Sequence, residues 1–239
     1  MNVTNEIKQK IIENNAKISE LLSENEVLLR KAGLSVPEEN FAVNSDDKIK
    51  IPSNYIRPKE YLVIKYHLEQ IAANWTVRSN IGYALQLSDL HNYILNRFNL
   101  WGSVATMLYK SAIVNLISIF EAIVFECATQ ICYQSNDCKL ERRRCQYAFN
   151  KTQRNNSFEA LKRINELGIT TFSDEELNRV KKVIDLRNRI HIRLADEKEF
   201  TSKDFNLALY NEVIQLLQRV SDEIYRNGVP LYRTCSKEQ

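Results

Sequence analysis

The chain has 239 residues, a formal net charge of +3, and only 5 Gly and 4 Pro among its residues. This composition is typical of helices, and the length allows one large domain or one domain with an extension. Because the net charge is mild, the overall field of the protein cannot drive nucleic-acid binding, and any such affinity requires local basic patches.

Residues 1–32 are expected to form an N-terminal helical arm. Apolar side chains recur there in alternating steps of four and three residues if two asparagines, Asn14 and Asn25, are counted in the same stripe. The apolar residues of the stripe are Ile7, Ile11, Ile18, Leu21 and Leu28. This pattern indicates a short coiled coil over about 5–31, in which the asparagines fix register and strand number. The same helix can equally fold back on the main domain, because Leu22, Val27 and Leu29 widen the stripe. Both arrangements remain open at this point.

Residues 33–58 are interpreted as a linker, since Gly33 can end the arm and three of the four prolines follow. A helical domain is expected over residues 59–233. Its first helix resumes at Arg57 and stops near Trp75, with one face formed by Tyr61, Ile64, Leu68 and Ile71. A second helix is expected over 81–98, capped by Asn80. His67 and His91 are assigned structural roles, because neither has an Arg or a carboxylate at helical spacing.

A long apolar helix is expected over residues 103–133. Glu121 lies inside it, and because a buried carboxylate is costly unless paired, it is expected to face a cation or a donor. The acids in this helix argue against a membrane span. Cys132, Cys138 and Cys145 fit no standard zinc spacing, so no metal and no cofactor are expected. The free cysteines and the polar N-terminus favour a reducing cytoplasm.

The next stretch is strongly basic and carries two aromatic residues, Tyr147 and Phe149. Cations for phosphates and rings for unstacked bases are the two ingredients of single-strand RNA binding. The candidate RNA-binding residues are Lys139, Arg142, Arg143, Arg144, Lys151 and Arg154. The alternative is a solvated loop. Further helices are expected over residues 158–167, closed by Gly168, and over 203–225.

Residues 173–195 hold the main cluster of side chains that could take part in catalysis. Ser173 and Glu176 have the spacing of a capping box at the start of a helix. Arg187 and His191 are four residues apart and therefore stand one above the other on one helix face, with Asn188 beside them. Imidazole exchanges protons near neutral pH and arginine holds anionic oxygens, so the cluster suits phosphate chemistry. Arg189 and Arg193 lie on neighbouring faces as supporting residues.

The segment Leu186–His191 resembles the signature of HEPN domains, a family of all-helical domains found in bacterial defence, toxin and RNA-processing systems. Arg187 and Asn188 match its first two positions and His191 its last, although three residues intervene here where the family has four to six. The apolar helix around Glu121 is similar to the family element that packs against the motif helix. Arg193 stands where one subgroup carries a Tyr that a partner enzyme modifies, so the chain does not resemble that subgroup.

The resemblance implies an all-α, HEPN-like helical bundle, here with an N-terminal helical or coiled-coil arm. It also implies a metal-independent endoribonuclease that acts as a homodimer, with Arg187, Asn188 and His191 as catalytic residues and Glu121 in support. RNA would be the substrate, and an antitoxin or regulatory protein a further partner, with no membrane involved. The alternative is a non-catalytic RNA-binding or protein-interaction subunit. A DNA-binding protein ranks last, because no recognition helix is evident. Neither a P-loop nor a His-Glu-x-x-His motif occurs in the sequence.

Overall fold

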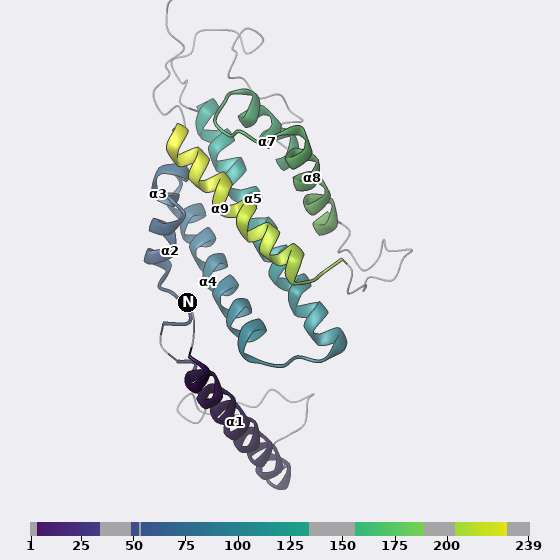
Figure 1. The fold of residues 1–239 in the computed structure, drawn as a ribbon. Coiled ribbons are helices and arrows are strands. Elements are labelled where there is room, and N and C mark those ends of the chain that lie inside the picture. Colours follow the sequence, from purple (N-terminus) through teal and green to yellow (C-terminus); the bar gives the residue numbers. More distant parts are fainter. Residues whose placement is uncertain (1–3, 34–48, 53, 134–155, 189–203, 229–239) are drawn as a thin grey trace, which may run out of the picture. The chain divides into compact units, whose positions relative to one another are not determined.

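The structure is a computed structural model that describes residues 4–33, 49–52, 54–133, 156–188 and 204–228. These described residues form eight helices and no strand, as the all-α prediction expected. The helices are labelled in Figure 1. The helices are α1 (Asn5–Lys31), α2 (Lys59–Lys65), α3 (Leu68–Ile71), α4 (Trp75–Arg97), α5 (Gly102–Tyr133), α7 (Ser157–Glu166), α8 (Asp174–Asn188) and α9 (Leu207–Asn227).

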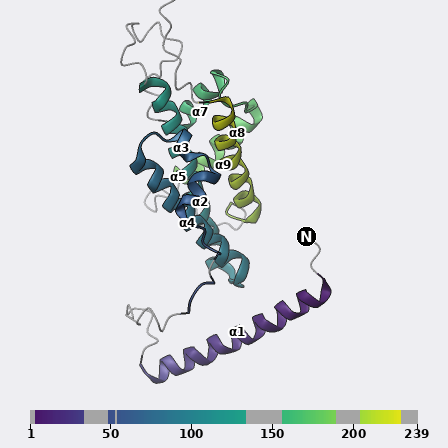
Figure 2. The same cartoon turned by 90° about the vertical axis from the view of Figure 1, so that its left-hand side faces the viewer.

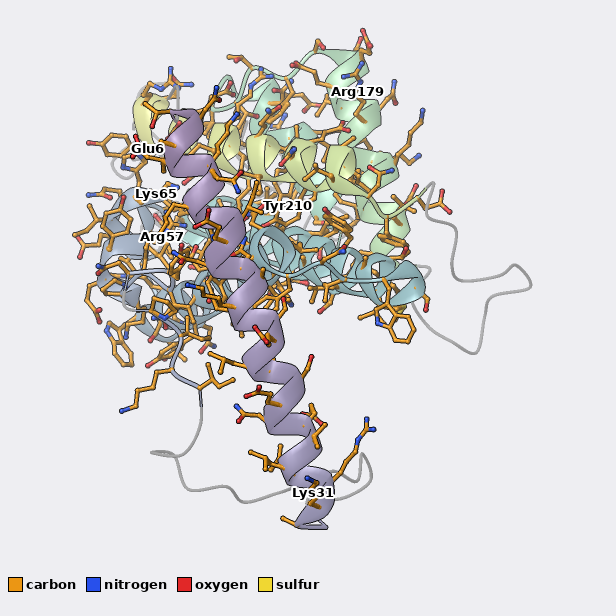
Figure 3. All side chains as sticks on the ribbon, turned by 60° about the horizontal axis from the view of Figure 1, so that its bottom comes forward. Glu6, Lys31, Arg57, Lys65, Arg179 and Tyr210 are labelled. Atoms are coloured by element: carbon orange, nitrogen blue, oxygen red, sulfur yellow. The ribbon has the colours of Figure 1, made fainter. Side chains whose placement is uncertain are left out.

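The chain divides into two compact units, residues 1–51 and 52–239. The first contains α1, a single uninterrupted helix of 27 residues that buries none of its side chains (Figure 2). Glu6 and Lys31 mark its two ends in Figure 3, where side chains project from all sides of the helix. Gly33 follows with φ of 69°, a conformation that glycine adopts without strain, so the helix ends where the sequence predicts.

The second unit is built around α5, which packs against α4, α7, α8 and α9 (Figure 1). Burial of apolar side chains on several of its faces drives this packing. The fully buried residues of α5 include Ile113, Ile117, Ile119, Ile123 and Val124. Leu161 and Ile164 of α7 and Leu217 and Ile224 of α9 complete the same core. A helix that is apolar on most sides is stable in water only when neighbours cover it, and here α3, α4, α7, α8 and α9 do so.

The segment Gly102–Ala128 of α5 is long and apolar enough to cross a membrane, judged by length and composition alone. Within its most apolar window of 18 residues, 56% of the residues are buried inside the structure. The core helix of a globular domain passes the same test, so this finding is weak evidence for a membrane span.

The region of α2 and α3 differs from the single helix that the sequence predicts. His67 adopts a left-handed backbone conformation with φ of 54°, and this residue separates α2 from α3. Leu68 and Ile71 are fully buried, but Tyr61 and Ile64 of the expected apolar face are 52% and 67% exposed. The prediction for that face was wrong because the break at His67 rotates the two halves of the stripe relative to each other.

Helix α4 begins at Trp75, where the sequence analysis placed the end of the preceding helix. Asn74 caps it, since its side-chain oxygen accepts hydrogen bonds from the backbone N–H groups of Thr76 (2.9 Å) and Val77 (3.4 Å). The proposed cap Asn80 lies inside the helix. The start could not be predicted from apolar periodicity, because Asn74 and Trp75 do not continue a helical pattern of apolar residues. The hydrogen bonds of the Asn74 cap set this helix boundary instead.

Candidate functional site

Helix α8 carries the first part of the predicted motif, and its N-terminus is fixed by the expected capping box. The backbone N–H of Glu176 donates to Ser173 Oγ (3.3 Å), and the backbone N–H of Ser173 donates to Glu176 Oε2 (2.8 Å). These bonds satisfy two amides that the helix itself leaves unpaired. They and the bonded Arg219 guanidinium lower the pKa of the Glu176 carboxyl. Arg187, at the other end of α8, therefore stands on a well-anchored element.

The apolar stripe of α8 faces α5 and α7. Leu177, Val180, Val183 and Ile184 are all buried in the core. Residues between these positions must point away from the core or along its rim, because side chains three and four apart share one face of a helix. Arg187, three residues after Ile184, continues the stripe itself, but it stands one residue before the end of α8 and its side chain is 43% exposed.

Glu121 of α5 is paired with the motif helix, as we expected from its place inside an apolar helix. Its Oε2 lies 3.4 Å from Nη1 of Arg187, and its Oε1 accepts a hydrogen bond from the Ser157 hydroxyl at 2.7 Å. The Glu121 side chain is only 12% exposed. A carboxylate so far from water needs such partners, so Arg187 and Ser157 together offset its desolvation. Helices α5, α7 and α8 meet at this point.

A pocket of about 570 Å³ opens beside the Glu121–Arg187 pair. Residues of α5, α7 and α8 line it: Ser118, Glu121, Ala122, Phe125, Asn156, Ser157, Phe158, Glu159, Lys181, Ile184, Asp185 and Arg187. A volume of this order is in the range of sites that bind small molecules or single nucleotide units. Its described lining contains two cations and three carboxylates, so positive charge is not in excess there.

One wall of the pocket places a ring beside two ammonium groups. Nζ of Lys181 lies 5.8 Å from the ring centroid of Phe158, and Nζ of Lys162 lies 6.0 Å from it. Phe158 is half-buried and lines the pocket together with Lys181. A ring flanked by cations offers both a stacking surface for a base and charge for a phosphate. Neither Phe158 nor Lys181 is among the site residues that the sequence predicts.

Several predicted site residues lie outside the described residues or have no described side chain. Asn188 is the last residue of α8, but its side chain is not described. His191, Arg189 and Arg193 lie outside the described residues. The same holds for the candidate RNA-binding residues Lys139, Arg142, Arg143, Arg144, Lys151 and Arg154. Of the predicted cluster, the structure therefore brings together Arg187 and Glu121 and leaves the contacts of the rest as predictions.

His67 contacts a carboxylate on another helix, α9. Its Nε2 lies 3.4 Å from Oδ1 of Asp222, and its ring stacks on Tyr225 with centroids 3.9 Å apart and planes 4° from parallel. Both partners belong to α9. The expectation that His67 has no such partner was based on spacing within one helix, and it missed this contact because 155 residues separate His67 from Asp222.

His91 is buried, and its Nε2 lies 3.2 Å from the Ser111 hydroxyl. Burial lowers the pKa of its imidazole.

Among the described residues, no group of three His, Cys, Asp or Glu side chains is positioned to hold a metal ion. Cys127 is buried and free, and burial raises the pKa of its thiol. The side chains of Cys132, Cys138 and Cys145 are not described.

No protein-family model, curated protein or solved structure matches this chain.

Proposed function

We propose that this chain is a metal-independent endoribonuclease of the HEPN type, acting in a bacterial defence or toxin system in the cytoplasm. The observation that carries the proposal is the position of Arg187, which lines an open pocket together with Lys181 and Phe158. A guanidinium, an ammonium group and an aromatic ring at one pocket are groups that recognise a nucleotide. The Arg-Asn-x-x-His sequence at residues 187–191 supplies the proton-transfer group.

In the proposed reaction the 2′-hydroxyl of a ribose attacks the adjacent phosphorus. His191 takes the proton of that hydroxyl as the new bond from O2′ to phosphorus forms. The bond from phosphorus to O5′ of the next nucleotide breaks, and the leaving oxygen receives a proton from His191 of the second copy in the proposed homodimer. Arg187 stabilises the charge on the phosphorane oxygens, and Asn188 orients one of them or the substrate. The products carry a 2′,3′-cyclic phosphate and a 5′-hydroxyl. The nucleophile belongs to the substrate, so the step needs no metal-bound water.

Glu121 has a supporting role in this proposal. Its ion pair with Arg187 fixes the guanidinium near the pocket while leaving it 43% exposed, so the remaining N–H donors can reach a phosphate. A homodimer would bring two copies of His191 together to share the acid and base roles. An antitoxin or regulatory protein is a proposed further partner.

The test compares the wild type with Arg187→Ala and His191→Ala on RNA in the presence of a chelator. Arg179→Ala is the matched control, because Arg179 lies on the same helix, pairs only with the exposed Glu175 in its described contacts, and does not line the pocket. Both site variants should lose at least about 100-fold in cleavage rate, the usual contribution of one acid–base or oxyanion group. The control should cut at the wild-type rate. Cleavage that persists in both site variants would refute the proposal.

A second substrate sharpens the test. An RNA whose cleaved residue carries a 2′-O-methyl group has no free 2′-hydroxyl, so we expect no cut at that position. If the modified RNA is cut there, the nucleophile is not the 2′-hydroxyl and the proposed chemistry fails, even if His191 matters. Mass spectrometry of the fragments should show the cyclic phosphate.

A non-catalytic RNA-binding or protein-interaction subunit is the second candidate, and two observations favour it. Arg187 is already engaged with Glu121, as a purely structural arginine would be. In addition, Lys59 Nζ lies 4.9 Å from the ring centroid of Tyr83 and 5.9 Å from that of Trp75, and these rings are 58% and 69% exposed. Exposed rings beside a cation form a platform on which bases can stack without being cleaved.

Binding and cleavage assays separate the two candidates. For the second, RNA stays intact, and its affinity falls steeply as salt rises because phosphate contacts release counterions. Trp75→Ala should then weaken binding by about 10-fold, corresponding to the loss of one stacked base. Leu87→Ala is a control on the same helix, since Leu87 is also exposed but has no ring. Equal affinities for both variants would exclude this platform.

A further inference from the structure

Three carboxylates line the pocket to which the proposed function assigns a nucleotide, although carboxylates repel phosphate. Two of these acids have cationic partners, because Glu121 pairs with Arg187 at 3.4 Å and Glu159 pairs with Lys162 at 3.9 Å. Asp185 makes no hydrogen bond or ion pair with any other described residue. Of the carboxylates in the described lining, Asp185 is therefore the one left for a ligand.

Lys181 is the cation that stands beside Asp185 on the wall of the pocket. The two residues are four apart on α8, so they share a face of the helix, with Cβ atoms about 5–6 Å apart. At the same spacing on the same helix, Glu175 and Arg179 form an ion pair at 3.0 Å. Within the described part of the chain, Lys181 and Asp185 form none, and a base that precedes an acid is the less favourable order on a helix. Both charged groups are thus available to a ligand.

The pocket also offers apolar surface for a flat ring. Ala122, Phe125, Phe158 and Ile184 contribute to its lining. The ring of Phe158 holds the Lys181 ammonium group by a cation–π contact at 5.8 Å, which places that group at the wall without an ionic partner. Unstacked bases bind to surfaces of this kind and present their Watson–Crick edges to polar side chains. An ionised carboxylate only accepts hydrogen bonds, so the edge that faces Asp185 must carry N–H donors.

We propose that Lys181 and Asp185 select guanine at this pocket, so that the chain cleaves RNA after guanosine, an inference that rests on the proposed function. The ammonium group donates and each carboxylate oxygen accepts, so the pair offers one donor followed by two acceptors. The Watson–Crick edge of guanine carries the complementary order, which is the O6 acceptor, the N1–H donor and the 2-amino donor. Nζ of Lys181 donates to O6, and the two oxygens of Asp185 accept from N1–H and from the amino group.

The other three bases of RNA satisfy this pair incompletely. Adenine and cytosine each carry one amino group beside a ring acceptor, so they reach at most one oxygen of Asp185 while Lys181 donates to that ring nitrogen. Uracil can place O4 at the ammonium group and N3–H at the carboxylate, but its O2 then faces the second carboxylate oxygen. Guanine alone matches all three groups. A two-point contact of this kind typically discriminates by at least about 10-fold.

Arg187 supplies the phosphate contact at a separate part of the same pocket. It stands two residues after Asp185, and side chains at that spacing project from different sides of a helix. The Watson–Crick edge of a guanosine lies opposite its glycosidic bond. When this edge faces Asp185, the ribose and its 3′-phosphate therefore extend away from the carboxylate. The Arg187 side chain is 43% exposed, so it can meet that phosphate.

Binding of nucleotides to the full chain tests the guanine contact without requiring cleavage. Isothermal titration calorimetry should show that guanosine 3′-monophosphate binds at least about 10-fold more tightly than adenosine 3′-monophosphate. Inosine 3′-monophosphate keeps O6 and N1–H but lacks the 2-amino group, so its affinity should fall between the two. Inosine that bound as tightly as guanosine would show that the second carboxylate oxygen reads nothing, which overturns the proposed contact.

Asp185→Asn replaces one acceptor oxygen with an amino group that faces a guanine donor. Because Asp185 is exposed, the variant should fold normally, and circular dichroism checks this. Its affinity for guanosine 3′-monophosphate should fall at least about 10-fold, while the adenosine nucleotide should bind no more weakly than before. Asp174→Asn is the matched control, since Asp174 is an exposed aspartate in the first turn of the same helix and does not line the pocket. The control should keep the affinities of the parent.

Equal affinities of the parent for the guanosine and adenosine nucleotides would overturn the proposal, as would a guanosine preference that survives in Asp185→Asn. Sequencing the 3′ ends of RNA fragments gives an independent readout. The parent should cut after guanosine, and Asp185→Asn should still cut but with a weaker base preference, because Arg187 and His191 are unchanged. Cleavage without any base preference in the parent refutes the guanine contact and leaves the nuclease intact. If neither nucleotide binds, the guanine contact also fails, and the cleavage assay with Arg187→Ala and His191→Ala decides the nuclease separately.

Discussion

Asp89 of α4 receives three hydrogen bonds from Arg57, which lies just before α2 and 32 residues earlier in the chain. The Arg57 backbone N–H donates to Oδ2 at 2.9 Å, its Nε donates to the same oxygen at 2.8 Å, and its Nη2 donates to Oδ1. The Asp89 side chain is 7% exposed. This pair raises the pKa of the Arg57 guanidinium, and it joins α2 to α4 (Arg57 is labelled in Figure 3).

Asp89→Asn should lower the free energy of unfolding by about 3 kcal/mol, since removal of one partner leaves a partly buried charge without compensation. Urea denaturation followed by circular dichroism measures the change. Glu175→Gln is the control, because the Glu175 side chain, which pairs with Arg179, is 80% exposed. We expect the control to cost less than about 0.5 kcal/mol. A loss for Asp89→Asn as small as that of the control would contradict the importance of the buried pair.

The ion pair between Glu121 and Arg187 should contribute little to stability. Arg187 is 43% exposed, so solvent screens the interaction, and a double-mutant cycle with Glu121→Gln and Arg187→Gln should give a coupling energy below about 1 kcal/mol. Equilibrium urea denaturation of the two single variants and the double variant provides this number. A coupling above about 2 kcal/mol would indicate that Arg187 is a structural residue and would favour the non-catalytic candidate.

The buried His91 should make the protein less stable in mild acid. Burial lowers its folded-state pKa below the value of 6.5 in the unfolded chain, so the unfolded state binds more protons as pH falls. Its contribution to stability is fully present above pH 6.5 and is lost progressively below it. His91→Gln does not titrate, so between pH 7.5 and pH 5 the wild type should lose more stability than this variant in urea denaturation. Parallel losses in the two proteins would show that His91 does not carry the effect.

The capping box of α8 should contribute about 1 kcal/mol to the free energy of unfolding. Ser173→Ala removes the acceptor for the Glu176 N–H and should lower the free energy of unfolding by that amount. Ser173→Asp keeps an oxygen acceptor and adds negative charge at the positive end of the helix, so it should restore stability to nearly the wild-type value. Thermal denaturation of the three proteins gives the comparison. If Ser173→Asp were as unstable as Ser173→Ala, the helix cap would not be the cause.

Much of the fold could be predicted from the sequence because its signals are local. The capping box of Ser173 and Glu176, the end of α1 near Gly33 and the long helix over 103–133 each depend on residues within a few positions of one another. Helical side chains three or four apart share a face, so the burial of Leu177, Val180 and Val183 also follows from spacing. Even the pairing of Glu121 with the motif helix could be anticipated, since an apolar helix cannot leave a carboxylate unpaired.

The amino-acid sequence by itself determined that the chain is helical, the stripe of α1 and the order of Arg187, Asn188 and His191 along the chain. Only the tertiary structure decided that His67 meets Asp222, that Arg57 meets Asp89, and that Phe158 and Lys181 join Arg187 at one pocket. The physical reason is the separation along the chain between the residues that interact. Helix formation and capping depend on neighbours within about one turn, which spacing reveals. Contacts between residues 32 or 155 positions apart depend on how the whole core packs, which no local pattern encodes.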